Sequence, residues 1–136
     1  AMTDDRIIYN ALKTPDGTII ESRHRHDYVT HTDKNGKGYM IDGGLDYVRS
    51  SANGDEEYLT VRIDDGHDKV REACTWGTYG INGDQPLSYK KLCDMDTAHI
   101  EVLLETQTRI YPAIKTAFET ELEFRSNMSE FAVSNV

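Results

Sequence analysis

Paired glycines inside a stretch rich in histidine, arginine and tyrosine constrain this chain more than any other feature. The stretch runs from Glu21 to Arg49, and Gly43–Gly44 lies near its end. Paired glycines supply the positive-φ conformations that other residues avoid, so the chain must turn there. An alternating segment follows over residues 45–49, which predicts a strand that carries Arg49 back beside Arg23 or Arg25.

Short segments of strand character, separated by turn signals, surround this stretch. Residues 6–12 are apolar and β-branched and are predicted to form one strand. Thr14–Gly17 combines proline with Asp-Gly and predicts a turn, and residues 32–36 predict a second hairpin turn. Residues 58–63 alternate as a further strand. The first two-thirds of the chain therefore predict a small antiparallel sheet.

Apolar residues at helical spacing mark the last third. Asp96 is predicted to cap a first helix that extends to Ile110, and Pro112 suits the first turn of a second helix ending near Arg125. Residues 126–136 carry few order signals and predict a flexible tail. The predicted fold class is α+β, a small antiparallel β-sheet followed by two C-terminal α-helices, in a single domain over residues 2–125.

Two segments lie between the predicted sheet and the predicted helices. Residues 69–75 are compatible with either a short helix or a strand. Residues 74–89 interleave three glycines with Trp76, Tyr79 and Tyr89, which predicts a loop ordered by aromatic side chains and open to close approach by a ligand.

Length and charge exclude several classes of function. A chain of 136 residues buries a working core without disulfide or metal staples. The net charge of −9 repels a nucleic-acid backbone, so DNA binding is not expected. Cys74 and Cys93 are too few for a disulfide scaffold and predict structural thiols. No apolar run approaches the roughly 20 residues of a spanning helix, which predicts a cytosolic protein without a membrane partner.

Three histidines within eight residues are the first candidate site. Zinc needs three or four ligands at fixed positions, but on an unbroken strand His24 and His26 share one face while His31 lies on the other. Hydrogen-bonded histidines on a polar hairpin are therefore favoured over a metal site. The same three residues support an alternative function, a small nucleotide phosphoesterase, although the chain lacks the familiar hydrolase motifs.

Arginines and aromatic residues form a second candidate site, for a small anionic ligand. Arginines clamp phosphates, and Trp76 or Tyr79 offers a stacking face for a base. The competing interpretation places Trp76 in the core and pairs each arginine with one of the many acids. It is favoured for each residue alone, whereas for the whole set the two interpretations are balanced. The arginines are Arg23, Arg25, Arg49, Arg109 and Arg125.

With these residues in view, the sequence resembles the first type of Thoeris anti-defence proteins encoded by phages. The resemblance rests on four pieces that stand in the expected order over residues 19–125. They are IIESRHRHDYV, DGGLDYVR, WGTYGINGDQPLSYKKL, and the helical pair TAHIEVLLETQ and FETELEFR.

The resemblance implies a non-enzymatic sponge without a cofactor, acting in the host bacterial cytoplasm. Such a protein sequesters a cyclic ADP-ribose-type signal, such as glycocyclic ADP-ribose, made by a bacterial TIR protein, and thereby blocks Thoeris immunity. Family members look like homo-oligomers, dimers that assemble into hexamers, with nucleotide pockets at subunit boundaries. Some are also similar in holding cyclic oligonucleotides at a separate site, which gives this chain a second candidate ligand class.

Carried over residue by residue, the resemblance gives each candidate a role. The five arginines are placed near phosphates, Trp76 and Tyr79 near a base, and Asn82 at a ribose or base edge. The leading segment also resembles small zinc-ribbon-like domains with cysteine pairs at two hairpin tips. Here those tips, residues 14–17 and 32–36, contain no cysteine, so zinc is not expected.

Overall fold

The computed structural model describes residues 4–80 and 82–134, with side chains up to residue 129, and it has the predicted α+β class. The strands are paired in antiparallel fashion, and two helices follow them near the C-terminus. The chain divides into two compact units, residues 1–64 (unit 1) and 65–136 (unit 2). The single domain predicted for residues 2–125 spans both units and stays a prediction.

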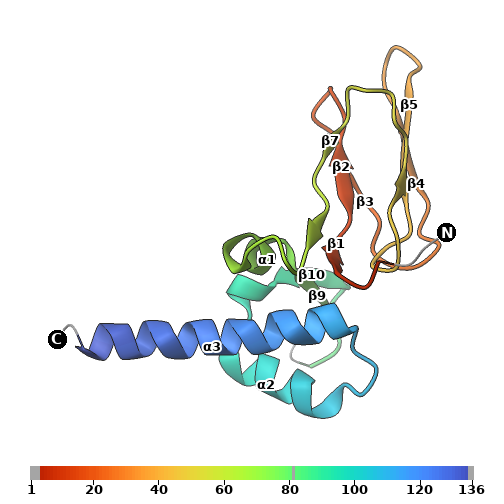
Figure 1. Ribbon diagram of the computed structural model, residues 1–136. Helices are drawn as coiled ribbons and strands as arrows, with labels where there is room; N and C mark the ends of the chain where they lie inside the picture. Colours follow the sequence, from red (N-terminus) through yellow and green to blue (C-terminus); the bar gives the residue numbers. More distant parts are fainter. Residues whose placement is uncertain (1–3, 81, 135–136) are drawn as a thin grey trace. The chain divides into compact units, whose positions relative to one another are not determined.

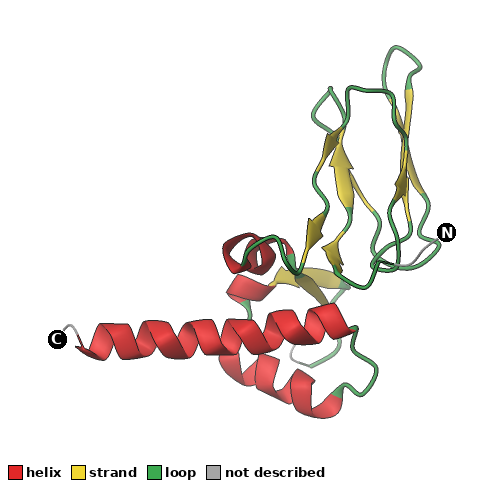
Figure 2. Ribbon diagram, in the orientation of Figure 1, coloured by secondary structure: helices red, strands yellow, loops and turns green. Residues whose placement is uncertain are grey.

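Unit 1 is made of short strands joined by turns (Figures 1 and 2). Strand β2 pairs with β3 and β7, β5 pairs with β4 and β6, and β1 pairs with β8. The predicted small sheet is thus divided into three smaller ones. The single strand predicted over residues 58–63 is wrong, because the segment is broken into β7 and β8, which pair in different sheets. The strands are β1 (Ile7–Tyr9), β2 (Ala11–Lys13), β3 (Ile19–Glu21), β4 (Val29–Thr32), β5 (Gly38–Asp42), β6 (Arg49–Ser50), β7 (Glu57–Tyr58) and β8 (Val61–Arg62).

Both predicted hairpin turns are confirmed. Between β2 and β3 the backbone N–H of Gly17 donates to the carbonyl oxygen of Thr14 at 2.9 Å. Between β4 and β5 the N–H of Gly36 donates to the carbonyl oxygen of Asp33 at 3.0 Å. The two hairpins meet through a small apolar core, to which each buried side chain contributes roughly 1.5–3 kcal/mol. The core residues are Leu12, Ile20, Tyr39 and Ile41, with Val29 packed against them.

A buried asparagine divides the strand predicted over residues 6–12 into β1 and β2. The amide nitrogen of Asn10 donates to the carbonyl oxygens of Asp42 and Tyr47, both at 3.2 Å. Its amide oxygen accepts from the hydroxyl of Thr60 at 3.1 Å. A buried amide must be hydrogen-bonded, and these bonds come from other segments of unit 1. The bonds from Asn10 to Asp42 and Tyr47 therefore hold the start of β2 against the turn that contains Gly43 and Gly44.

Unit 2 contains all the described helices and one β-hairpin (Figure 2). Helices α1 and α2 both pack against α3. The buried face of α3 carries Ala113, Ile114, Ala117, Phe118 and Glu121, which follow helical spacing. The elements are α1 (His67–Ala73), β9 (Thr75–Thr78), β10 (Ser88–Lys91), the 3₁₀ turn η1 (Leu92–Asp94), α2 (Thr97–Thr106) and α3 (Pro112–Ser134).

The elements of unit 2 differ from the sequence-based expectation in three places. The stretch predicted as a loop over residues 74–89 contains strand β9 and the start of β10, which pair as a hairpin. The undecided segment over residues 69–75 is helical as far as Ala73, and its last residue begins β9. Asp96 stands at the N-cap position of α2 as predicted, but its side chain makes no capping hydrogen bond, and the helix ends at Thr106, short of Ile110. Helix α3 begins at Pro112 as predicted, but it continues through residues 126–134, which were predicted to be a flexible tail. Those residues contain neither glycine nor proline to end the helix; residues 135–136 lie outside the described part.

Replacing Asn10 with alanine should lower the free energy of unfolding by about 2–4 kcal/mol, because buried carbonyl groups lose their donor. Urea denaturation followed by circular dichroism measures the loss. The matched control is Asn53→Ala, which removes an exposed bond of 2.9 Å to the carbonyl oxygen of Gly38. We expect that control to cost less than about 1 kcal/mol. Equal losses in the two variants would show that the buried amide does not organise unit 1.

Candidate functional site

A tight loop of residues 22–28, here called the basic loop, carries two of the predicted arginines and two of the clustered histidines. The hydroxyl of Ser22 donates to the carbonyl oxygen of Asp27 at 2.7 Å. The carboxylate of Asp27 in turn accepts from the backbone N–H of Arg23 at 2.8 Å. These two bonds close the loop on itself.

The centre of the basic loop is strained. His26 has φ of 67°, the one positive value outside glycine among the described residues. Left-handed backbone costs roughly 1–2 kcal/mol for a residue with a Cβ, and such strain often occurs at functional sites. The resulting turn places His24, Arg25 and His26 in exposed positions. A short basic segment is therefore held in one conformation and faces solvent.

Of the paired glycines, Gly44 lies directly against the basic loop and Gly43 lies against Tyr47. A Cβ added to Gly44 would lie 2.2 Å from the carbonyl carbon of His24, and one added to Gly43 would lie 2.0 Å from the carbonyl oxygen of Tyr47. The N–H of Gly44 donates to the hydroxyl of Ser22 at 2.9 Å. The predicted turn is confirmed, and close approach of backbone to backbone is a second reason for glycine there.

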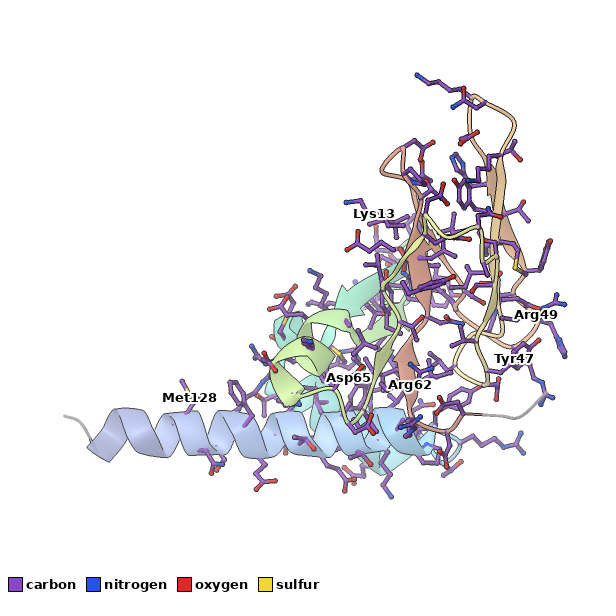
Figure 3. All side chains as sticks on the ribbon, turned by 45° about the horizontal axis from the view of Figure 1, so that its top comes forward. Lys13, Tyr47, Arg49, Arg62, Asp65 and Met128 are labelled. Carbon is purple, nitrogen blue, oxygen red and sulfur yellow. The ribbon has the colours of Figure 1, made fainter. Side chains whose placement is uncertain are left out.

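The strand predicted over residues 45–49 is wrong, because residues 44–46 form a turn and strand β6 begins only at Arg49. Arg49 itself returns to the end of the basic loop, where it contacts Tyr28. Its guanidinium carbon lies 5.9 Å from the centroid of the Tyr28 ring. The guanidinium also pairs with the buried carboxylate of Asp42 at 3.1 Å, while 63% of the Arg49 side chain stays exposed. The Tyr47 hydroxyl lies 3.4 Å from the same carboxylate, and Figure 3 shows Tyr47 and Arg49 close to each other. Asp42 thus anchors one edge of a cation that still faces solvent.

Arg23 pairs with an acidic residue of the strand that precedes the basic loop. Its guanidinium donates to the carboxylate of Glu21 at 2.6 Å. Burial raises the pKa of the nearby Tyr9 to about 12, and the charge of Glu21 adds to this while Arg23 opposes it. Arg23 therefore stabilises the strand side of the loop, and Arg25 is its exposed arginine.

The three clustered histidines do not converge. The Nε2 atom of His31 lies 2.8 Å from the carboxylate of Asp16 at the β2–β3 turn, whereas His24 lies 3.9 Å from Asp27. Hydrogen bonds from Thr14 and His31 hold the pKa of Asp16 well below its usual range. Among the described residues, no group of three or more His, Cys, Asp or Glu side chains is placed to hold a metal ion.

In unit 2 the predicted stacking residues lie in the β9–β10 hairpin. The ring of Trp76 packs against Phe118 of α3, with centroids 5.6 Å apart at 60°. Tyr79, at the end of β9, is 56% exposed, and Asn82 is exposed in the connecting loop. Trp76 therefore packs in unit 2, and Tyr79 and Asn82 are the accessible members of this set. Arg109 is exposed in the connection between α2 and α3.

Arg125 belongs to a charged cluster around a fully buried carboxylate, Glu121. Glu121 accepts from Arg71 at 2.8 and 2.9 Å and from Arg125 at 2.7 Å, and the ring of His67 lies at 2.9 Å. Arg125 also donates to the hydroxyl of Thr97 at 2.8 Å and to the carbonyl oxygen of Leu92 at 3.1 Å. Its guanidinium thus joins α3 to the start of α2.

Burial alone would raise the pKa of Glu121, but the hydrogen bonds from Arg71, Arg125 and His67 outweigh it and lower the pKa to about 2. Sequence reasoning missed this cluster. The signal was present, because Glu121 falls at the helical spacing of Ile114, Ala117 and Phe118, on the apolar face of its helix. An acid on such a face requires partners.

The structure thus places the predicted residues in two groups. Arg25 and Arg49 lie on or beside the basic loop of unit 1, with Arg23 at its base. The remaining candidates, Trp76, Tyr79, Asn82, Arg109 and Arg125, belong to unit 2. Tyr28 and Asp42 were not predicted as site residues, although the structure places both against Arg49.

Comparison of the chain with family models, curated proteins and solved structures finds no match in any of the three. Among the described residues, no helix is both long and apolar enough to cross a membrane.

Replacing Gly44 with alanine should destabilise the protein more than Gly36→Ala, because only the first substitution adds a backbone clash. Both glycines have positive φ, 55° and 82°, but a Cβ on Gly36 meets nothing within 4 Å among the described residues. We expect Gly36→Ala to cost about 1–2 kcal/mol and Gly44→Ala at least twice as much. Chemical denaturation of the two variants in parallel tests this, and similar losses would contradict the close packing of the glycine turn on the basic loop.

Replacing Glu121 with glutamine should cost about 3–5 kcal/mol of unfolding free energy, since it leaves two arginines beside a neutral group. Glu123→Gln, an exposed substitution on the same helix, is the control and should cost little. Because the folded pKa of Glu121 is about 2, its contribution of about 3 kcal/mol is present above pH 4.5 and lost as pH falls toward 2.

Denaturation at pH 7 and at pH 3 measures that dependence. The difference in stability between wild type and Glu121→Gln should shrink at the lower pH. A difference that stays constant would mean that ionised Glu121 is not the stabilising species.

Proposed function

We propose that this protein binds a cyclic ADP-ribose-type nucleotide and sequesters it without degrading it. The observation that carries the proposal is the basic loop, a closed and strained turn that holds Arg25 in solvent, with Arg49 beside it at Tyr28. A preformed group of cations suits a diphosphate, because guanidinium groups match phosphate geometry and little ordering is needed on binding.

The phosphate contacts are assigned first to Arg25 and Arg49. Two N–H groups of Arg49 face Asp42, which fixes the guanidinium and leaves its other N–H groups to donate to a ligand. Arg23 donates to Glu21 and stabilises the strand side of the basic loop. Each charge-assisted bond contributes about 1.5–3 kcal/mol.

The candidates proposed for a base and a sugar lie in unit 2. Tyr79 is exposed at the start of the hairpin loop and offers a stacking face, and Asn82 can bond a ribose or base edge. Arg109 is exposed and serves as a further phosphate contact. Arg125 is bonded to Glu121, Thr97 and Leu92, which favours a positioning role.

Sequestration also requires that the ligand be enclosed. Ion pairs with fully exposed arginines contribute only about 0–1 kcal/mol, so tight binding needs a drier pocket. In our proposal self-association supplies it, with dimers that assemble into hexamers and nucleotide pockets at the subunit boundaries. The separation of candidate residues into two groups allows a second ligand class, cyclic oligonucleotides, at a different site.

The biological role proposed from the sequence resemblance is anti-defence. In the host bacterial cytoplasm, a sponge would remove the signal that a TIR protein makes, so that the downstream effector of Thoeris immunity is not activated. Hydrolysis by His24, His26 and His31 is less favoured as an alternative, because His31 bonds Asp16 and is not placed with the other two.

Arg25→Ala and Arg49→Ala should each weaken the binding of a cyclic ADP-ribose isomer by about 2–5 kcal/mol if the arginines bond phosphate in a dry pocket. Isothermal titration calorimetry measures the change. Lys34→Ala is the control, because it removes an exposed positive charge from the β4–β5 turn. An unchanged affinity in both arginine variants would remove them from the site.

The fate of the ligand tests the sponge itself. After the complex is heated, the released molecule should have the mass and chromatographic retention of the molecule added. A new chemical species would contradict sequestration and indicate an enzyme, whereas failure to bind any isomer would overturn the proposed ligand.

A further inference from the structure

The two faces of the β9–β10 hairpin have different surroundings. The register pairs Trp76 with Lys90 and Gly77 with Tyr89. Neighbouring residues on a strand point to opposite faces. Trp76 and Tyr89 therefore lie on opposite faces of this hairpin, and the face of Trp76 packs on Phe118. The predicted stacking residue Trp76 is on the inner face.

The outer face is built around a glycine. A Cβ added to Gly77 would lie 3.2 Å from Cε1 of Tyr89 and 3.2 Å from Cδ1 of Leu87. Both side chains therefore lie over the bare backbone of Gly77, and any larger residue there would displace them. We call the surface formed by Gly77, Leu87 and Tyr89 the Tyr89 platform.

The Tyr89 platform is exposed although it is apolar. Tyr89 is 44% exposed and Leu87 is 47% exposed. Apolar side chains grouped on one surface commonly mark an interaction site. Tyr79, which is also exposed, follows the end of the paired strand.

The charges beside the Tyr89 platform favour an anion. Lys91 lies two residues after Tyr89 and so shares its face of the strand. Its ammonium group lies 3.7 Å from the carboxylate of Glu72, and both side chains are more than half exposed. A pair that is long and exposed is weak, so a ligand phosphate can compete with Glu72 for Lys91. Strand β10 contains two lysines and no acidic residue.

We propose that the Tyr89 platform is by itself a stacking site for an adenine base, with Lys91 beside a phosphate joined to that base. A flat aromatic surface next to a cation fits a planar base joined to an anion. The inference rests on the proposed function for the identity of the ligand. It assigns the stacking role to Tyr89 in place of Trp76.

The probe is 1,N6-etheno-ADP, whose fluorescent base is quenched when it stacks on an aromatic ring. Wild-type protein should quench the probe in a saturable manner. Tyr89→Ala should weaken binding roughly 5- to 100-fold, the range for loss of one base stack, whereas Tyr89→Phe should retain it. Tyr58→Ala is the matched control, because Tyr58 is an exposed tyrosine of unit 1.

A second variant tests the geometry without removing the ring. Gly77→Ala should displace Tyr89 and Leu87 and weaken binding, while Gly38→Ala, with nothing within 4 Å of its Cβ among the described residues, should leave it unchanged. Circular dichroism of each variant confirms that the fold is retained. Full binding by folded Gly77→Ala and Tyr89→Ala would overturn the inference.

The outcomes also separate this inference from the proposed function. If wild type binds a cyclic ADP-ribose isomer but Tyr89→Ala binds it equally well, the function stands and the Tyr89 platform does not. If etheno-ADP is quenched through Tyr89 but no cyclic isomer binds, the Tyr89 platform stands and the proposed ligand is wrong. If Tyr89→Ala changes only the oligomeric state, the surface joins copies of the chain, and the inference is overturned.

Discussion

Asn10 holds unit 1 together at the point where β1 gives way to β2. Its side-chain amide donates to the carbonyl oxygen of Asp42, and its backbone carbonyl oxygen accepts from the backbone N–H of Ser22 at 2.9 Å. Ser22 then bonds the N–H of Gly44 and closes the basic loop. Because each of these groups is removed from water, losing one leaves the next without a partner. Asn10 thus holds the glycine turn through its side-chain amide, and it holds the loop that carries Arg25 through its backbone carbonyl.

Unit 2 also depends on partners for a buried polar group, here the charged carboxylate of Glu121. Glu121 is buried on the inner face of α3, and arginines from α1 and α3 neutralise it. Such a cluster is weak support for stability compared with an apolar core, but it specifies which helix faces meet. It also explains why Arg125, which sequence reasoning assigned to a ligand, bonds the beginning of α2.

The sequence predicted those features of the fold that depend on the backbone preferences of single residues. The turns at Gly17 and Gly36, the glycine turn at Gly43–Gly44 and the start of α3 at Pro112 follow from backbone preferences of single residues. The break at Asn10 could not be foreseen, because the partners of its side chain lie more than thirty residues away. The hairpin over residues 74–89 was missed because its glycines are also typical of loops.

Some properties of the candidate site residues also followed from residue type, and others depend on the tertiary structure. Residue type alone indicated that Arg25 and Arg49 were basic and accessible, and the structure places Arg49 beside the basic loop through Tyr28. Residue type could not separate Trp76, which packs on Phe118, from Tyr79, which is exposed. That difference depends on which face of a strand meets a helix distant in sequence. Pairing partners, such as Glu21 for Arg23, are likewise fixed by tertiary structure.

The strained backbone of His26 has a consequence for the speed of binding. Its unfavourable φ is imposed when the protein folds, because bonds made by Ser22 and Asp27 already close the loop around it. In the proposed binding, an anion that arrives therefore meets a loop that these bonds have already closed. Association at such a loop is limited by diffusion and orientation, and ionic strength governs its rate. Differences in affinity among related ligands should then appear as differences in residence time.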